Sequence, residues 1–241
     1  MSKIIFLHHS TGECIWRGNT NPYVYRLTGY GDVKRHFRKL NKKAREKHSL
    51  SERNFPAKIP YGWKNYPFDY YNIWVKNAGD APYKSEPTLE ILTREYDVII
   101  FKHCYPVSII LEDTGKPDIN SDEKRLENYK LQYEALKQKM HEFPGTRFIT
   151  WTPAVRVKSG LTEDQALRTR EFHRWMLEEW YEKGDNIYIW DFYNYETEGG
   201  LYLKDEYSMG NGNSHPSKEF SARLAPLFAK YIMDVAENKL G

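Results

Sequence analysis

Two residues near opposite ends of the sequence have the chemistry of a nucleophile and its base. Ser10 follows the apolar run 4–7 in the segment His-His-Ser-Thr-Gly, and His215 lies in the turn-forming segment 209–217. A serine hydroxyl is a weak nucleophile until a base takes its proton, and histidine is the side chain whose pKa lies near neutrality. The pair therefore suits acyl transfer through an acyl-serine. The alternatives are Ser10 as a helix cap and His215 as a structural histidine.

The elements that must position these residues alternate along the chain. Apolar, β-rich runs predict five strands, and amphipathic spacing or capping residues predict the helices between them. The expected strands are 4–7, 70–75, 97–101, 147–151 and 187–192, and the expected helices are 32–47, 88–94, 120–142, 162–183 and 217–238. We expect loops at 17–31 and 49–67, where glycine, asparagine and proline gather.

This alternation predicts an α/β fold, a three-layer α/β/α sandwich with a five-stranded parallel sheet. The chain of 241 residues fits one such domain, residues 1–241, with no internal repeat or linker. Right-handed crossovers place the carboxyl ends of all the strands at one edge of the sheet, where open parallel sheets bind their ligands. We therefore expect the chemistry at this edge, with Ser10 on the turn after the first strand.

The composition indicates a globular protein. Aromatic residues make up 15% of the chain, with 19 Tyr and 7 Trp, which suits a core and also carbohydrate contacts. The net charge of +3 is too small for a nucleic-acid footprint, although the basic face of the helix 32–47 offers a phosphate-binding alternative. No segment approaches the about 20 apolar residues of a membrane span.

The N-terminal segment and the cysteines suggest a compartment. The apolar run 4–7 is too short for a signal peptide, so the chain is expected to be cytoplasmic. Cys14 and Cys104 form no metal-ligand spacing and are expected to be free thiols in a reducing environment. No feature of the sequence indicates the oligomeric state.

The order of the motifs resembles the SGNH (GDSL-like) hydrolases, in a divergent branch with His-His-Ser-Thr-Gly as the nucleophile block. Its elements are a serine after the first strand, Asn-Ala-Gly at 77–79 after the expected second strand, and His-Pro before the last helix. The resemblance implies a flavodoxin-like sandwich, ester hydrolysis through an acyl-serine, and no metal or other cofactor. It assigns Ser10 as the nucleophile and His215 as the general base. It also implies that the backbone N–H groups of Ser10 and Gly79 form the oxyanion hole.

The sequence departs from the family pattern at two places. The Gly-x-Asn-Asp after the third strand is absent, so Lys102, His103 or Ser108 could replace its asparagine or grip an acidic substrate group. The aspartate three residues before the histidine is replaced by Gly212. The groups that could orient His215 instead are a backbone carbonyl or the side chains of Asn211, Asn213, Asp191 and Asp205.

These observations predict a serine hydrolase that removes a short acyl group, such as acetyl, from a small or carbohydrate-like ester. The alternative is an altered SGNH-like protein that binds a sugar or an acidic ligand without hydrolysis, with Lys102 and His103 as contacts. Adjacent residues of a strand point to opposite faces, so His8 and His9 are not expected to share a metal ion. We expect at least one of them to be a packing or hydrogen-bonding residue beneath the nucleophile turn.

Overall fold

A parallel sheet of five strands forms the centre of the computed structural model, which describes residues 1–62 and 64–240. The strand order is β2-β1-β3-β4-β5, and every neighbouring pair is parallel. The strands are β1 (Lys3–His8), β2 (Ser49–Asn54), β3 (Val98–Phe101), β4 (Arg147–Trp151) and β5 (Ile187–Trp190). The expected sandwich with a five-stranded parallel sheet is confirmed.

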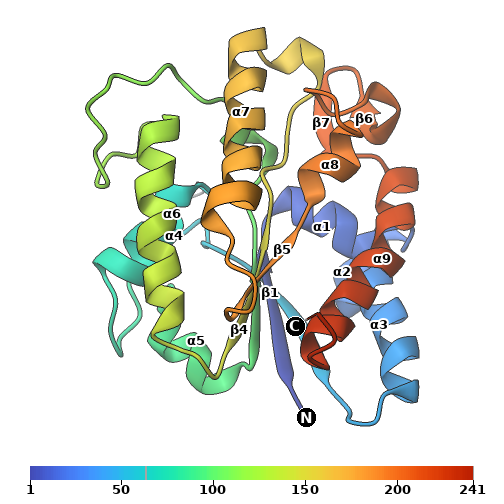
Figure 1. Cartoon of the computed structure of the whole chain (residues 1–241). Helices are drawn as coiled ribbons and strands as arrows, with labels where there is room; N and C mark the ends of the chain where they lie inside the picture. The colour runs from blue at the N-terminus through green and yellow to red at the C-terminus, as the bar shows by residue number, and fades with distance from the viewer. Residues whose placement is uncertain (63, 241) are drawn as a thin grey trace.

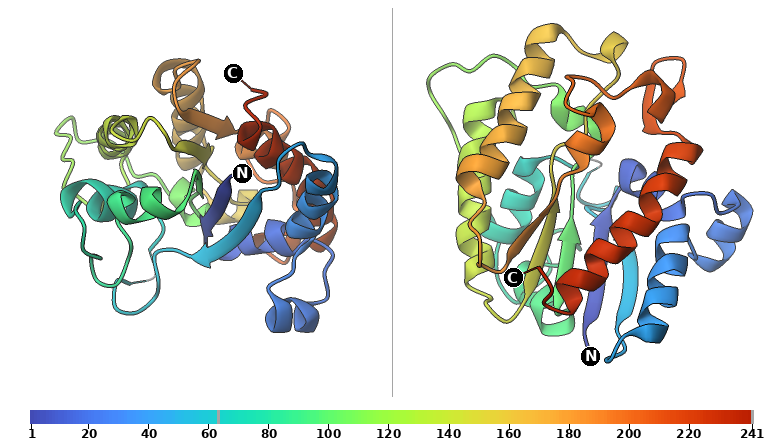
Figure 2. Two further views of the ribbon diagram at one scale, coloured as in Figure 1. Left: turned by 90° about the horizontal axis from the view of Figure 1, so that it is seen from below. Right: turned by 45° about the vertical axis from the view of Figure 1, so that its right-hand side comes forward.

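Helices cover both faces of the sheet (Figure 1), and β1 shows why both faces must be covered. Ile4 and Phe6 pack into the hydrophobic cluster that includes residues of α1 (Ser10–Arg17), α3 (Asp32–Lys43) and α9 (Lys218–Ala236). Ile5 and Leu7 pack into the cluster that includes residues of α5 (Leu89–Glu95), α6 (Leu126–His141) and α7 (Glu163–Trp175). A strand that is buried on both faces has apolar residues at every position and no alternation with polar ones. Residues 4–7 have this continuous apolar pattern. The view from below in Figure 2 shows the sheet between these two helical layers.

The helices of the first layer begin with the one that carries Ser10. They are α1 (Ser10–Arg17), α2 (Pro22–Thr28), α3 (Asp32–Lys43) and α9 (Lys218–Ala236). α2 lies in a segment expected to be a loop. α9 begins at its Ser217 cap, as the sequence predicts.

The second layer and the connections complete the chain. The α-helices are α4 (Pro67–Tyr71), α5 (Leu89–Glu95), α6 (Leu126–His141), α7 (Glu163–Trp175) and α8 (Phe192–Thr197). The π-helical segment Asn72–Lys76 continues α4, and the π-helical segment Met176–Trp180 continues α7. The sequence predicts a helix that begins at residue 120, but α6 begins at Leu126. Residues 111–125 instead form an ordered loop. Among the described residues, no helix is long and apolar enough to cross a membrane.

The prediction of a second strand at residues 70–75 is wrong. Residues 70–75 are helical, and the strand beside β1 is β2, in a segment expected to be a loop. The apolar residues Tyr70, Ile73 and Trp74 are buried at a helical spacing. β2 is an edge strand in which Leu50 is the one fully buried residue, so it has no apolar run that sequence analysis could detect.

A two-stranded hairpin outside the main sheet leads into the last helix. Its antiparallel strands are β6 (Ser208–Gly210) and β7 (Asn213–Pro216), and β7 packs against α1. This hairpin, and not the main sheet, therefore presents His215 toward the start of α1.

Trp151 is predicted to be a main source of stability. It is 1% exposed, and its ring contacts Phe6, Phe192 and Phe228 at centroid distances of 5.3, 4.5 and 4.9 Å. Trp151→Ala should lower the free energy of unfolding by about 3 to 5 kcal/mol because it leaves a large cavity. Urea denaturation measures this change. The matched change Leu167→Ala, at a 37% exposed side chain, should cost about 0.5 kcal/mol, and equal effects would contradict the prediction.

Candidate active site

Ser10 is the first residue of α1 and follows β1 almost directly. It is exposed, and its neighbour His9 is the N-cap residue, whose carbonyl accepts the first helical hydrogen bond from Glu13. The N–H groups of the first turn therefore have no partner within the helix and face the edge of the sheet. Gly12 permits this tight connection, because a Cβ there would lie 2.6 Å from the Cβ of His8.

His215 is oriented by Asn213. The side-chain oxygen of Asn213 lies 2.8 Å from His215 Nδ1 and 3.0 Å from the backbone N–H of His215. The backbone N–H can only donate, so this Asn213 atom is the acceptor and His215 Nδ1 carries the proton. Nε2 is then the basic nitrogen of the ring. The edge of the ring also packs on Tyr105, with centroids 4.9 Å apart.

The two residues meet at one pocket of about 150 Å³ at the carboxyl edge of the sheet. Its walls come from the start of α1, the segment after β3, the entrance of α4 and the hairpin. The lining residues are His9, Ser10, Asn65, Tyr66, Cys104, Tyr105, Pro106 and His215. The fold thus brings Ser10 and His215 from opposite ends of the chain to the same cavity.

A buried lysine and a cysteine lie beneath Ser10. Lys102 is 0% exposed, and its Nζ donates a hydrogen bond of 2.8 Å to Cys104 Sγ, which lies 3.8 Å from Ser10 Oγ. Burial raises the pKa of the Cys104 thiol, but the positive charge of Lys102 and hydrogen bonds from Lys102, the Thr11 N–H and Ser10 outweigh it. The net effect lowers the pKa of the Cys104 thiol that lies under Ser10.

The substitutes expected for the missing family asparagine lie outside the pocket lining. Lys102 donates its hydrogen bond to Cys104. His103 is buried, and its Nε2 lies 2.7 Å from the hydroxyl of Tyr133. Burial, together with the charge of Lys102, lowers the pKa of His103 to about 3. Ser108 is buried and donates its hydroxyl to the carbonyl of Tyr105 at 2.6 Å. Lys102 and His103 are therefore not placed as ligand contacts either.

Gly79 also lies outside the pocket lining. It follows a helix and not a strand, its carbonyl accepts a hydrogen bond from Thr88 Oγ1 at 2.6 Å, and its N–H binds the carboxylate of Glu90. The structure therefore corrects the expectation that Gly79 contributes to an oxyanion hole. The error has the same cause as the wrong second strand.

The distant carboxylates do not orient His215. Asp191 Oδ1 lies 2.7 Å from His173 Nε2 and 3.0 Å from Thr152 Oγ1. Asp205 opens a short 3-10 turn before β6, and Asn211 lies at φ +52° in the exposed hairpin turn. Of the groups considered from the sequence, Asn213 is the one with a hydrogen bond to the His215 ring.

His8 and His9 are structural in their contacts. His8 Nε2 lies 2.6 Å from Glu52 and ties β1 to the edge strand β2, while His9 Nε2 binds the carbonyl of Pro56. Burial, with a smaller contribution from Lys102, lowers the pKa of His9 to about 4, so its ring stays neutral beside Ser10. No group of three or more His, Cys, Asp or Glu among the described residues is placed to hold a metal ion.

Several pocket residues were not identified from the sequence. Cys104 and Tyr105 follow β3 directly, so their position at a strand end was the available signal. Asn65 and Tyr66 precede α4 in a segment expected to be a loop, and no feature of the sequence indicated that they line the pocket. Asp69 positions Tyr66 by accepting its N–H at 2.8 Å.

The comparisons with known proteins leave the function open. No family model matches the chain, and no curated protein matches it significantly. The structure resembles the periplasmic domain of a lipopolysaccharide acetyltransferase from Salmonella ser. Paratyphi A, with a TM-score of 0.46 and 13% sequence identity. The match covers 96% of this chain and 84% of that one. The resemblance to the SGNH hydrolases stays a prediction, and the function must be inferred from the residues of the site.

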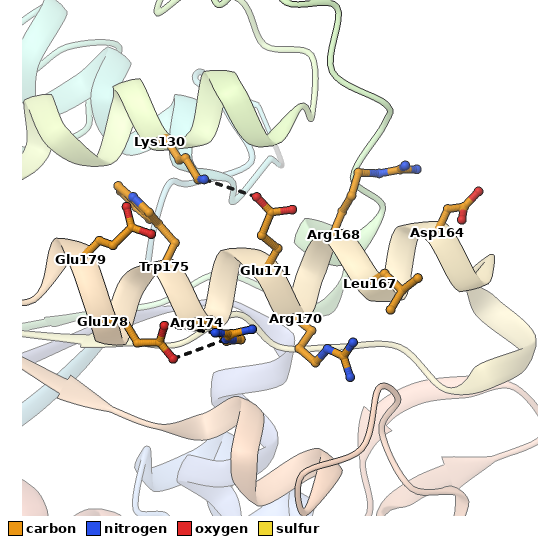
Figure 3. A pocket seen from close by; sticks show the side chains of 10 residues that line it. All are labelled: Lys130, Asp164, Leu167, Arg168, Arg170, Glu171, Arg174, Trp175, Glu178 and Glu179. Carbon is orange, nitrogen blue, oxygen red and sulfur yellow. Dashed lines mark hydrogen bonds and ion pairs between the residues drawn. The ribbon is translucent and has the colours of Figure 1, made fainter.

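A wider depression of about 470 Å³ lies along the outer face of α7 (Figure 3). One ion pair joins Lys130 of α6 to Glu171 of α7 at 3.4 Å, and another joins Arg174 and Glu178 one turn apart at 3.3 Å. Its described lining contains no serine, cysteine or histidine. It lacks the combination of a serine or cysteine nucleophile with a histidine base, so the smaller pocket, which Ser10 and His215 line, is the candidate site.

The pKa of His215 is predicted to lie below 6.5. Burial lowers it, and the positive charge of Lys102 lowers it further. Lys102→Met should therefore raise the pKa of His215, whereas Lys183→Gln, an exposed lysine at the opposite edge of the sheet, should not. A pH titration of the His215 ring signals by NMR, assigned with His215→Gln, measures both shifts. An unchanged His215 pKa in folded Lys102→Met would contradict the prediction.

Proposed function

We propose that this protein is a serine hydrolase that cleaves short-chain esters through an acyl-enzyme on Ser10. The observation that carries the proposal is that Ser10 and His215 line one pocket, with Asn213 leaving Nε2 of His215 as the base. In this proposal Ser10, His215 and Asn213 take the three roles of a catalytic triad, with an asparagine in place of the acid.

In the first step, Ser10 Oγ attacks the ester carbonyl carbon and its proton passes to His215 Nε2. The tetrahedral intermediate then expels the alcohol, which takes that proton from the imidazolium. A water molecule attacks the acyl-serine in the second step and gives its proton to His215. The intermediate then breaks its bond to Ser10 Oγ, which takes the proton back from the imidazolium, and the acid is released. Asn213 keeps Nδ1 protonated throughout but supplies no full negative charge to stabilise the imidazolium.

The start of α1 supplies electrostatic stabilisation for the oxyanion. The N–H of Ser10 belongs to the first turn and lies at the positive end of the helix dipole. The N–H of Thr11 is engaged with Cys104 Sγ. The proposed donor is therefore the Ser10 N–H.

The size of the pocket supports a small acyl group. Its volume of about 150 Å³ is below the range of about 300 to 1,000 Å³ for drug-sized ligands. An acetyl group is a suitable occupant, whereas the alcohol part of the ester must extend past the mouth. The proposed substrate is an O-acetylated small molecule or carbohydrate.

Loss of either catalytic residue should abolish most esterase activity. In Ser10→Ala and in His215→Ala, kcat/KM for p-nitrophenyl acetate should fall by about 10³-fold or more, and the double variant should be no worse, since the two residues act in one step. Ser49→Ala, at an exposed serine on the opposite edge of the sheet, is the matched control. Activity surviving both single substitutions would reject this dyad.

Asn213 should control the pH dependence as a positioning residue. In Asn213→Ala, kcat/KM should fall by at least about tenfold because the His215 ring loses its fixed tautomer. In Asn213→Asp, an anion next to Nδ1 should raise the pKa of His215. Since only the neutral ring is a base, the acid limb of the pH–kcat/KM profile should move to higher pH. A lower rate with an unmoved limb in Asn213→Asp would indicate a merely structural role.

A further inference from the structure

Two cations outside the pocket lining contact residues that line it. Lys124 Nζ lies 4.1 Å from the ring centroid of Tyr66 and donates to the carbonyl of Pro106 at 3.2 Å. The guanidinium carbon of Arg156 lies 5.3 Å from the ring centroid of Tyr105. All three of these neighbours line the pocket. Each cation is therefore in direct contact with a residue that bounds the cavity.

Neither cation forms an ion pair within the described part of the chain, unlike the nearby Lys64, which pairs with Asp122. Burial lowers the pKa of Lys124, and the positive charges of Arg156 and Lys64 lower it further, while Asp69 opposes them. Arg156 donates from Nη1 to the carbonyl of Gly160 at 3.0 Å, and its buried Nε has no hydrogen-bond partner. Lys124 and Arg156 thus lie beside the pocket lining with no ion-pair partner among the described residues.

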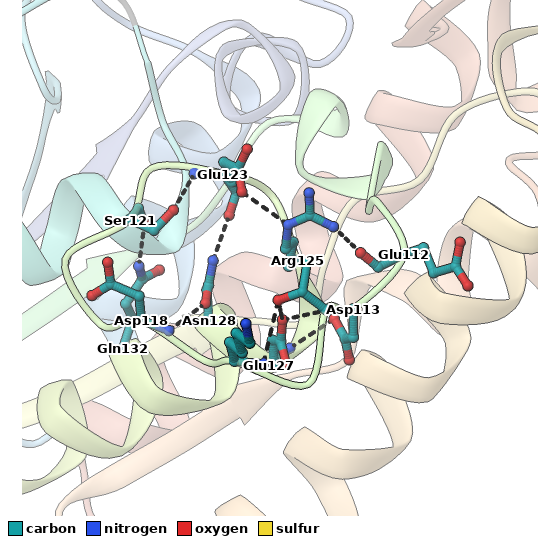
Figure 4. Close-up of polar contacts among 11 residues, drawn as sticks. Glu112, Asp113, Asp118, Ser121, Glu123, Arg125, Glu127, Asn128 and Gln132 are labelled. Atoms are coloured by element: carbon teal, nitrogen blue, oxygen red, sulfur yellow. Dashed lines mark hydrogen bonds and ion pairs between the residues drawn. The ribbon is translucent and has the colours of Figure 1, made fainter.

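Lys124 is held in place by an ordered loop. Its carbonyl accepts a hydrogen bond of 2.7 Å from the N–H of Leu111, which closes the loop at its two ends. Figure 4 shows the polar contacts that fasten the loop to α6, among them Glu127 N–H with Asp113 at 3.1 Å and Asp118 N–H with Asn128 at 2.8 Å. A fixed cation loses little entropy when it binds an anion, so this arrangement is preorganised.

We infer that Lys124 and Arg156 form an anion-binding subsite at the pocket mouth, and that the alcohol part of the natural ester carries a carboxylate or a phosphate. The inference rests on the proposed ester hydrolysis. A pocket of about 150 Å³ takes the acyl group, so the alcohol part lies at the mouth beside the two cations. An O-acetylated acidic sugar has the required chemistry.

Matched esters test this selectivity. The probes are 4-acetoxybenzoate and 4-acetoxyphenyl phosphate, compared with neutral methyl 4-acetoxybenzoate, each rate being divided by that of alkaline hydrolysis. The wild-type protein should prefer the anionic esters by at least about tenfold in kcat/KM, and Lys124→Gln and Arg156→Gln should each reduce this preference by about fivefold. High salt should reduce it as well. Lys183→Gln removes the same charge far from the site and should retain the preference.

A binding measurement separates failure of the subsite from failure of the hydrolase. The Ser10→Ala protein is titrated by NMR with 4-hydroxybenzoate and with its methyl ester. Tighter binding of the anion that is lost in Lys124→Gln and Arg156→Gln supports the subsite even if no ester is turned over. Ser10-dependent turnover with no preference for anionic esters, or equal binding of the two ligands, overturns the inference.

Discussion

The buried contact between Lys102 and Cys104 is the interaction on which the site depends. Burial lowers the pKa of the Lys102 ammonium, because a charge out of water costs free energy unless a partner compensates it, and Cys104 Sγ at 2.8 Å is that partner. The pair lies directly under the first turn of α1, where a Cβ on Gly12 would come within 3.0 Å of the Lys102 side chain. The close packing of β1, β3 and α1 around one charge therefore fixes where Ser10 stands and what it faces.

Sequence patterns predicted the central fold because its inner strands are buried on both faces. β1, β3 and β4 appear as apolar runs, and the closing helix α9 as an amphipathic one. β2 was missed because an edge strand of sequence SLSERN carries a polar pattern and depends on pairing with β1. Residues 70–75 were misread as a strand, since their aromatic and β-branched residues also suit a buried helix. Tertiary packing, and not local propensity, decides both segments.

A residue of the candidate site could be predicted where its type and its position relative to a strand or helix were enough to assign it a role. Ser10 after the first strand and His215 before the last helix fall into that class, and Asn213 was among the groups considered for orienting the imidazole. Cys104 and Tyr66 were not predicted as site residues, because their meeting with Ser10 depends on long-range packing. The misplacement of Gly79 results from the wrong strand, so a single error of secondary structure produced an error of chemistry.

The hairpin β6–β7 has a consequence for how such a site is built and lost. The nucleophile is mounted on the central sheet through β1, whereas the imidazole comes from a short ribbon outside that sheet. Folding of the domain and alignment of its reactive groups therefore have separate structural supports. Substitutions in the hairpin can therefore alter or abolish the activity without unfolding the central sheet and its helices. The hairpin can thus diverge in sequence more freely than the central sheet.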